Sequence, residues 1–398
     1  MGASVCGAVP VNPWRSSGTS VNPGSSIDFV SAEVGWRVTG QVFGPHIDGD
    51  LAAFVGGEVD WPGTSVSATS DGGRTWSTVL EVSTGIWGLD FVGPRVGYAV
   101  AVTSLRRTSD GGSHWQEVGE PPGHALVWVD FQSASDGFGL TGPGTLVRTT
   151  DGGSSWSGAG LGTAGAAACF VSPDVGYVAD RAGDLYRTSD GARSWRVAES
   201  APKPPVQYVG PWADLACSGG DVALGLEAFC AAACGAFPNL YLLDYSDDGG
   251  RTWAARSGGW LRDGDAAFGS SGPHLPYGAL GAVALNPAGA AVFSDVPGPS
   301  GNSADDVQVG TVAASGGGTT LEMGSAPALP ASPVGYALAT CHVLGIGFVG
   351  RTGWLYFDDG AVGTAGHRLG EPVVWQTTDT GAVWSVLSTG PTEAPPPA

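Results

Sequence analysis

The chain has 398 residues, of which 67 are glycine, and its formal net charge is −20 at pH 7. This charge argues against a nucleic-acid backbone as partner, and no apolar run approaches the twenty residues that a membrane-spanning helix needs. Six cysteines, an even number, in an acidic chain rich in tryptophan indicate an oxidising compartment. We therefore expect a secreted, periplasmic or extracellular monomer without a membrane span.

The first recurring feature along the chain is a short apolar stretch that ends in an aromatic residue, followed six residues later by glycine and a second aromatic. This spacing predicts two strands joined by a tight turn. The first aromatic residue of this pattern is Phe29, Phe91, Phe131 or Phe170, and the same position is held in weaker copies by Cys217, Ala284 and Leu329. An aspartate directly precedes the first three of these aromatics, and we interpret Asp28, Asp90 and Asp130 as structural hydrogen-bonding groups.

The second recurring feature is a phrase that reads Ser/Thr-Asp-Gly-Gly in its first three copies and varies at one position in the others, and in every copy tryptophan follows the aspartate by five residues. Asp-Gly-Gly between two strands is a hairpin signal, because glycine tolerates positive φ and aspartate accepts backbone hydrogen bonds. We interpret these aspartates as structural and not catalytic. The six copies carry Asp71 and Trp76, Asp110 and Trp115, Asp151 and Trp156, Asp190 and Trp195, Asp248 and Trp253, and Asp379 and Trp384. A degenerate seventh copy covers residues 315–321.

Seven repeats of four short strands predict an all-β chain that folds as a single seven-bladed β-propeller of four-stranded antiparallel blades. The propeller is expected over residues 1–390, with the Asp-Gly hairpins near positions 71, 110, 151, 190, 248, 316 and 379. Residues 391–398 are rich in proline and are expected to form a disordered tail. Both Trp14 and Trp384 could begin an outer strand of the last blade, so the ring-closing strand is left open.

The paired phrases resemble those of the Asp-box, or bacterial neuraminidase repeat, propeller superfamily over residues 14–388. The superfamily includes sialidases, other propeller glycosidases and sortilin-type receptors. The 39- to 41-residue spacing of the early repeats is most similar to photosystem II assembly-factor propellers. This resemblance implies the fold and is weak for function, since such propellers host unrelated activities.

The lengths of the connections predict that the two faces of the ring differ. The turn between the first and second strands and the Asp-Gly hairpin keep nearly constant lengths, and alternate connections of a blade lie on opposite faces. We call the face with these two turns the turn face, and the opposite one the loop face. The long excursions belong to blades five, six, seven and one, so the loop face of these blades is the expected functional surface.

Most candidate ligand-binding residues lie in these excursions, which include Gln41–Ser65 in blade one and Thr340–Trp375 in blade seven. Trp87 and Trp128 precede inner strands of the blades with short loops and are expected to approach the channel mouth on the same face. Aromatic platforms beside carboxylates suit a sugar, which offers apolar ring faces and many hydroxyls. The candidates are Trp61, Trp87, Trp128, Tyr208, Trp212, His274, Tyr277, Trp354, Tyr356, His367 and Arg368.

Two functions remain open for this surface. The first is a non-catalytic scaffold that binds a protein or glycan. The alternative is a glycoside hydrolase, which needs two carboxyl groups at a defined separation, with candidates Asp48, Asp50, Asp358 and Asp359. No Arg-Ile-Pro motif is present, which makes a sialidase a poor match. We expect no cofactor, although Asp48 and Asp50 form a weak calcium pattern.

The cysteines offer two candidate disulfides. Cys169 and Cys217 enter the innermost strands of neighbouring blades and could lie close together, and Cys230 and Cys234 share one loop and could form a local bridge. Buried free thiols are the alternative, and no cysteine pair has a matching pair of ligands at zinc spacing.

Overall fold

The computed structural model describes residues 27–39, 64–83, 85–122, 124–200, 208–230, 239–253, 261–262, 279–286, 289–295, 307–314, 321–323, 342–358 and 373–389. Within these ranges all regular structure is β, arranged as seven four-stranded antiparallel sheets, each built from four strands that are consecutive in the chain. No helix in the described ranges has the length and apolar character to cross a membrane. The predicted all-β propeller of four-stranded antiparallel blades is confirmed.

The first four blades are regular and have short strands. Their bounds are β1 Ile27–Phe29, β2 Gly35–Thr39, β3 Thr64–Thr69 and β4 Ser77–Val82; β5 Ile86–Phe91, β6 Gly97–Ala101, β7 Ser104–Thr108 and β8 Gln116–Val118; β9 Leu126–Phe131, β10 Gly137–Thr141, β11 Leu146–Thr149 and β12 Ser157–Gly158; β13 Gly165–Phe170, β14 Gly176–Asp180, β15 Leu185–Thr188 and β16 Arg196–Glu199.

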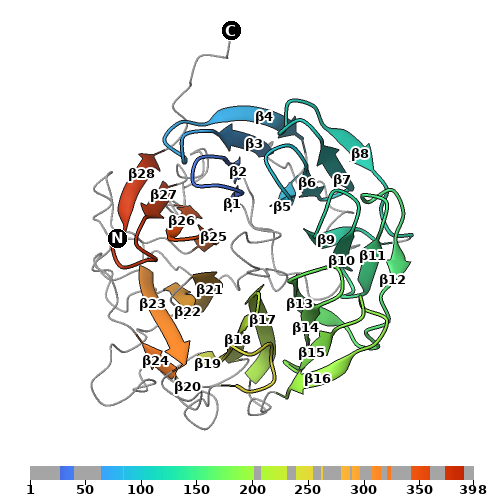
Figure 1. The fold of residues 1–398 in the computed structure, drawn as a ribbon, viewed down its shortest axis with the longest axis vertical. Coiled ribbons are helices and arrows are strands. Elements are labelled where there is room, and N and C mark those ends of the chain that lie inside the picture. The colour runs from blue at the N-terminus through green and yellow to red at the C-terminus, as the bar shows by residue number, and fades with distance from the viewer. Residues whose placement is uncertain are drawn as a thin grey trace, which may run out of the picture.

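The remaining three blades have longer inner strands and complete the ring. Their bounds are β17 Tyr208–Ser218, β18 Asp221–Cys230, β19 Asn239–Ser246 and β20 Leu261–Arg262; β21 Ala279–Asn286, β22 Gly289–Asp295, β23 Val307–Ala314 and β24 Leu321–Met323; β25 His342–Val349, β26 Thr352–Asp358, β27 Val373–Thr377 and β28 Ser385–Thr389. Figure 1 shows the first strand of each blade facing the centre of the ring.

The turn face is held together by the same hydrogen bond in blade after blade. The N–H that follows the hairpin aspartate donates to a carbonyl in the turn between the first and second strands, so both turns lie at one end of the blade. The bonds run from Gly72 to Glu33, Gly111 to Arg95, Gly152 to Ser135, Gly191 to Asp174, Gly249 to Gly220 and Thr380 to Arg351, at 2.7–3.0 Å.

The other end of each blade carries the second pair of connections. Backbone N–H groups in the turn between the second and third strands donate to the segment that enters the blade, as from Val102 to Gly85 and from Arg181 to Ala164. The strands that flank residues 40–63 and 359–372 also end on this side, because β2 ends at Thr39 and β26 at Asp358. The predicted division into a turn face and a loop face therefore matches the strand order.

Aromatic stacking joins neighbouring blades. The aromatic residue after the glycine of one blade lies flat on the inner-strand phenylalanine of the next, as for Trp36 on Phe91 with ring centroids 3.5 Å apart. The glycine is required because a Cβ on Gly97 would lie 2.2 Å from the ring of Phe91. Tyr98 on Phe131 and Phe138 on Phe170 repeat this stack at 3.4 and 3.5 Å.

The ring closes through packing between the first and last blades. Trp354 of β26 stacks on Phe29 with centroids 3.7 Å apart, and its Nε1 donates to the Gly72 carbonyl at 3.0 Å. The fourth strand of the last sheet is β28, so the strand that Trp384 precedes closes the last blade. Residues near Trp14 lie outside the described ranges.

The inner strands of the last blade differ from the prediction. The six-residue spacing from aromatic to glycine places the inner aromatic position at Leu329, but in the structure Phe348 occupies this position and pairs with Gly353. The turn there has only two residues between Val349 and Thr352, so the interval shrinks from six to five and the pattern is missed. The excursion predicted as Thr340–Trp375 therefore contains β25, β26 and part of β27, and its long connection is confined to residues 359–372, between β26 and β27.

Candidate functional site

The Asp-Gly hairpins are stapled by their own side chains, as the third blade illustrates. Asp151 accepts hydrogen bonds from the Ser155 N–H at 2.8 Å, the Ser155 hydroxyl at 2.6 Å and the Thr149 hydroxyl at 2.8 Å. The Ser155 side chain, and then its N–H, lower the pKa of Asp151 to about 2. A carboxylate held this firmly in its charged form stabilises a turn and is a poor proton donor.

Three of the predicted ligand-binding aromatics lie in the core. Trp128, Trp354 and Tyr356 are each 0% exposed, and the Tyr356 hydroxyl donates to the Val38 carbonyl at 2.6 Å across the ring closure. These side chains pack between blades, where no ligand reaches them. Their assignment as binding residues is corrected: Trp354 and Tyr356 belong to a strand and not to an excursion.

Other predicted residues reach the loop face or lie outside the described residues. Trp87 is half-buried near the start of β5, and Tyr208, Trp212 and Asp358 lie in the parts of β17 and β26 that approach the loop face. The remaining candidates lie outside the described residues, namely Asp48, Asp50, Trp61, His274, Tyr277, Asp359, His367 and Arg368. The strand order thus brings segments of blades two, five and seven to one face.

A groove of about 450 Å³ opens on the loop face of the third blade. One wall is the turn at residues 143–146 and the other is the segment 158–164, which leads into the fourth blade. Gly165 N–H donates to the Gly144 carbonyl at 2.8 Å at its base. Arg181 of the fourth blade supports it through hydrogen bonds to Ala164 and Gly142 at 3.1 and 3.3 Å.

The sequence search missed this groove because it followed long insertions, and the third blade is short. The available signal was the run from Gly158 to Gly165, in which Gly160 and Gly162 adopt positive φ. Glycine at these positions leaves peptide groups uncovered, so an extended ligand could approach the backbone closely.

The inner strands place a row of carboxyl groups next to one another. Asp28, Asp90 and Asp130 are 1–4% exposed, and each accepts the N–H of the inner phenylalanine of the next blade at 2.6–2.8 Å. Burial raises the pKa of all three, to about 7 for Asp130. The structural hydrogen bonding predicted for these residues is present.

On the turn face, arginines link neighbouring blades. Arg107 lies over the ring of Tyr98 of its own blade, 5.9 Å from its centroid, and donates from Nε to the Tyr98 hydroxyl at 3.2 Å. This hydroxyl in turn donates to the Ala134 carbonyl of the next blade at 3.0 Å. Arg148 donates from Nη1 to the Gly191 carbonyl of the next blade's hairpin at 2.8 Å. These cations therefore stabilise the seams on the side away from the groove.

Residues 67–210 match the family model described as "Photosynthesis system II assembly factor YCF48". The chain is an Asp-box propeller related to this family. The matched segment begins within β3 and ends within β17, so it includes the whole of the second, third and fourth blades. The resemblance found in the repeat phrases is therefore confirmed. No curated protein matches the chain.

Solved structures share the propeller fold at low identity. A GH74 xyloglucanase from Xanthomonas campestris is 13% identical, with a TM-score of 0.54, over 95% of this chain and 56% of that chain. The Asp-box propeller thus spans little more than half of that enzyme. YCF48 bound to a D1 peptide is 18% identical, with a TM-score of 0.45, over 76% of this chain and 81% of that chain. YCF48 from Cyanidioschyzon merolae is 15% identical, with a TM-score of 0.44, over 75% and 83%.

The described part of the Asp-box propeller contains no group of three His, Cys, Asp or Glu side chains placed to hold a metal ion. The calcium pattern at Asp48 and Asp50 lies outside it. The carboxylates of the repeat frame have structural hydrogen-bond partners on the turn face or between inner strands. The candidate binding surfaces are therefore the groove and the excursions of the loop face.

Proposed function

We propose that the chain is an exported, seven-bladed, non-catalytic scaffold that binds an extended segment of a partner protein on its loop face. The observation that carries this proposal is the open, glycine-walled groove of about 450 Å³ on that face. The excursions predicted for blades five, six, seven and one would extend the same surface. Backbone groups exposed by glycine suit a peptide, whose own N–H and C=O groups can pair with them.

Two further observations support the proposal. The sequence match over residues 67–210 is to a family described as an assembly factor, a role that suits protein binding. The structure also joins Cys169 to Cys217 in a disulfide, which favours an oxidising compartment and therefore export. The fold shared with GH74 enzymes carries no activity by itself, so glycoside hydrolysis stays the alternative that the experiment must exclude.

The test uses the oxidised full-length chain and a displayed library of random twelve-residue peptides. Gly158→Trp places an indole in the groove, and a Cβ on Gly158 meets nothing within 4 Å. Gly93→Trp is the matched control, since Gly93 is equally unobstructed but lies in a turn on the turn face. We expect selected peptides to lose at least about tenfold in affinity with Gly158→Trp, about 1.4 kcal/mol, and little with Gly93→Trp.

Two results would reject the proposal. Loss of binding with Gly93→Trp alone would move the site to the turn face. Release of new reducing ends from a polysaccharide panel, abolished by an Asp→Asn change at position 48, 50, 358 or 359, would establish a glycoside hydrolase instead.

A further inference from the structure

In each of the first three blades, the residue at one position of the inner strand forms a hydrogen bond to the next blade. It directly precedes the inner phenylalanine and lies opposite the aromatic residue that follows the glycine. In three blades it is an aspartate whose carboxylate accepts the N–H of the next inner phenylalanine: Asp28 to Phe91, Asp90 to Phe131 and Asp130 to Phe170.

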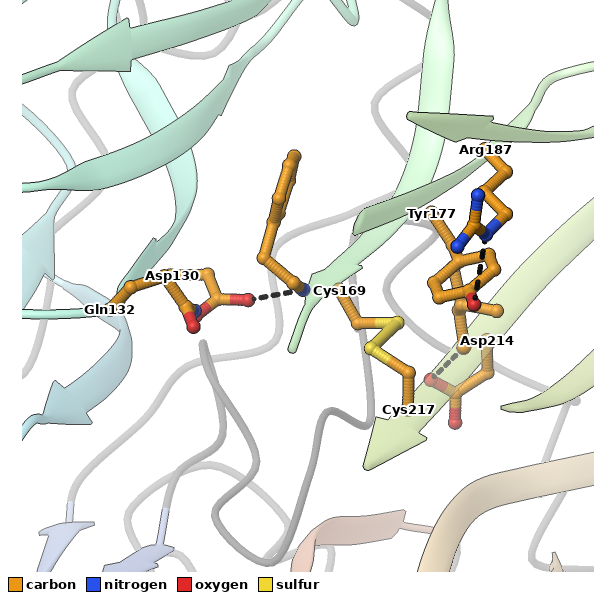
Figure 2. The surroundings of a disulfide bond; sticks show 9 residues. Asp130, Gln132, Cys169, Tyr177, Arg187, Asp214 and Cys217 are labelled. Carbon is orange, nitrogen blue, oxygen red and sulfur yellow. Dashed lines mark hydrogen bonds between the residues drawn. A yellow bond between two sulfur atoms is a disulfide. The ribbon is translucent and has the colours of Figure 1, made fainter. Parts of the chain in front are cut away.

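Cys169 occupies this position in the fourth blade. It precedes Phe170 and pairs with Tyr177, in the same register as Asp130 with Phe138. Its sulfur is bonded to that of Cys217, with the two Cα atoms 6.0 Å apart (Figure 2). A covalent bond therefore stands where the three preceding blades use a hydrogen bond.

Cys217 in turn occupies the receiving position of the fifth blade. Cys217 pairs with Val222 across β17 and β18, and the next pair, Ser218 with Asp221, closes a two-residue turn. Cys217 is therefore the last inner-strand residue before the turn-closing pair. Alternation along the strand then directs the Cys217 N–H away from β18, as the inner phenylalanine N–H groups are directed in the regular blades.

The same seam also lacks the means for an aromatic stack. Tyr177 faces a blade that carries Cys217 where the preceding blades carry phenylalanine, and the cluster between β13 and β17 is built from small and aliphatic side chains such as Ala167, Leu215 and Leu224. This seam adjoins the end of the family match at residue 210. It therefore joins the regular blades to the divergent ones.

We propose that the Cys169–Cys217 disulfide is a redox-sensitive lock at the seam between the fourth and fifth blades, and that the ring opens first at this seam when the bond is reduced. A small dithiol supplies two electrons and two protons; the S–S bond breaks, two S–H groups form, and the dithiol closes to its own disulfide. The reduced seam keeps neither a covalent bond, nor an inner carboxylate staple, nor a ring stack.

Burial of the disulfide limits the access of a reductant to its sulfur atoms. Cys169 and Cys217 are both 0% exposed, so a reductant reaches the sulfur atoms only when the seam opens transiently. The rate of reduction of the native protein thus measures the opening of this seam, and reduction then makes the opening more frequent.

The experiment is hydrogen–deuterium exchange by mass spectrometry on the full chain, oxidised and after reduction with dithiothreitol. We expect exchange to rise at least about tenfold in peptides from β13 and β17, and less than about twofold in peptides from β5 and β9. The melting temperature should fall by about 5 °C. Cys169→Ser with Cys217→Ser should reproduce the reduced pattern, and dithiothreitol should then have no further effect.

A rescue variant separates a specific lock from general damage. Cys169→Asp with Cys217→Ser restores a carboxylate opposite the N–H of residue 217, and we expect it to recover at least about half of the lost protection without sensitivity to dithiol. An equal rise of exchange at all seams on reduction, or no rise at β13 and β17, would overturn the proposal. If a double variant does not fold, the reduced wild-type chain still decides between these outcomes.

Discussion

Asp130 is a buried carboxyl group whose charged form the fold disfavours. Its side chain is 4% exposed, and burial raises its pKa to about 7 against the opposing effect of hydrogen bonds from Phe170 and Gln132. Asp90 lies close enough that the charge of Asp130, after burial, helps to raise the pKa of Asp90 as well. Ionising Asp130 in the folded protein therefore costs free energy through lost hydration.

This pKa makes the stability of the protein depend on pH in a defined direction. The unfolded chain ionises Asp130 near pH 4, whereas the folded chain holds the proton until about pH 7. The stabilisation is complete below about pH 4 and is lost as the pH rises through 7. At about 1.4 kcal/mol per pKa unit, the loss reaches about 4 kcal/mol in alkaline solution.

Asp130→Asn removes the ionisation and keeps the shape: the amide oxygen can still accept the Phe170 N–H, and the Gln132 amide, which donates to Asp130, turns over so that its oxygen accepts from the new NH2 group. We expect the variant and the wild type to differ by less than about 1 kcal/mol in free energy of unfolding at pH 4.5. At pH 8 the variant should be more stable by about 2–4 kcal/mol. Urea unfolding followed by tryptophan fluorescence, at several pH values between 4.5 and 8, measures this difference. A difference that stays constant across this range would refute the reasoning.

The other predictions concern the turns and the seams. Asp151→Asn should destabilise the protein at pH 7 and have a shrinking effect as the pH falls from about 4 to 2, because the folded-state pKa is lowered to about 2 and its stabilisation is present only above this range; acid titration monitored by fluorescence checks the sign. Gly176→Ala should destabilise by about 1–3 kcal/mol, since a Cβ there lies 2.1 Å from the Phe170 ring. Gly158→Ala, which meets nothing within 4 Å, should change the urea midpoint little.

The repeat frame was predictable because its interactions are local. The hairpin aspartate bonds to groups two to four residues away, as in Asp151 with Thr149 and Ser155, so the short stretch 149–156 contains all the hydrogen-bond partners of this carboxylate. The 39- to 41-residue spacing of the first four phrases then requires sheets of similar size, and the separation of long and short connections onto two faces follows from strand alternation.

The prediction from the repeat spacing was wrong where the turn between the first and second strands has a different length. Gly350 adopts positive φ in a two-residue turn of the last blade, and a search for a six-residue interval passes over Phe348 and Gly353. The groove of the third blade was missed for a related reason: its walls come from two short connections that only the closed blade brings together.

The amino-acid sequence by itself determined the hairpins, the four-stranded repeat and the side of the ring on which the chain length varies, since each depends on contacts within one repeat. Only the tertiary structure decided which large side chains are available to a ligand. Tyr356 bonds to Val38 across 318 residues, and Cys169 reaches Cys217 across 48. Such partners meet only when whole blades pack against each other, because a propeller buries its largest side chains between blades and not within them.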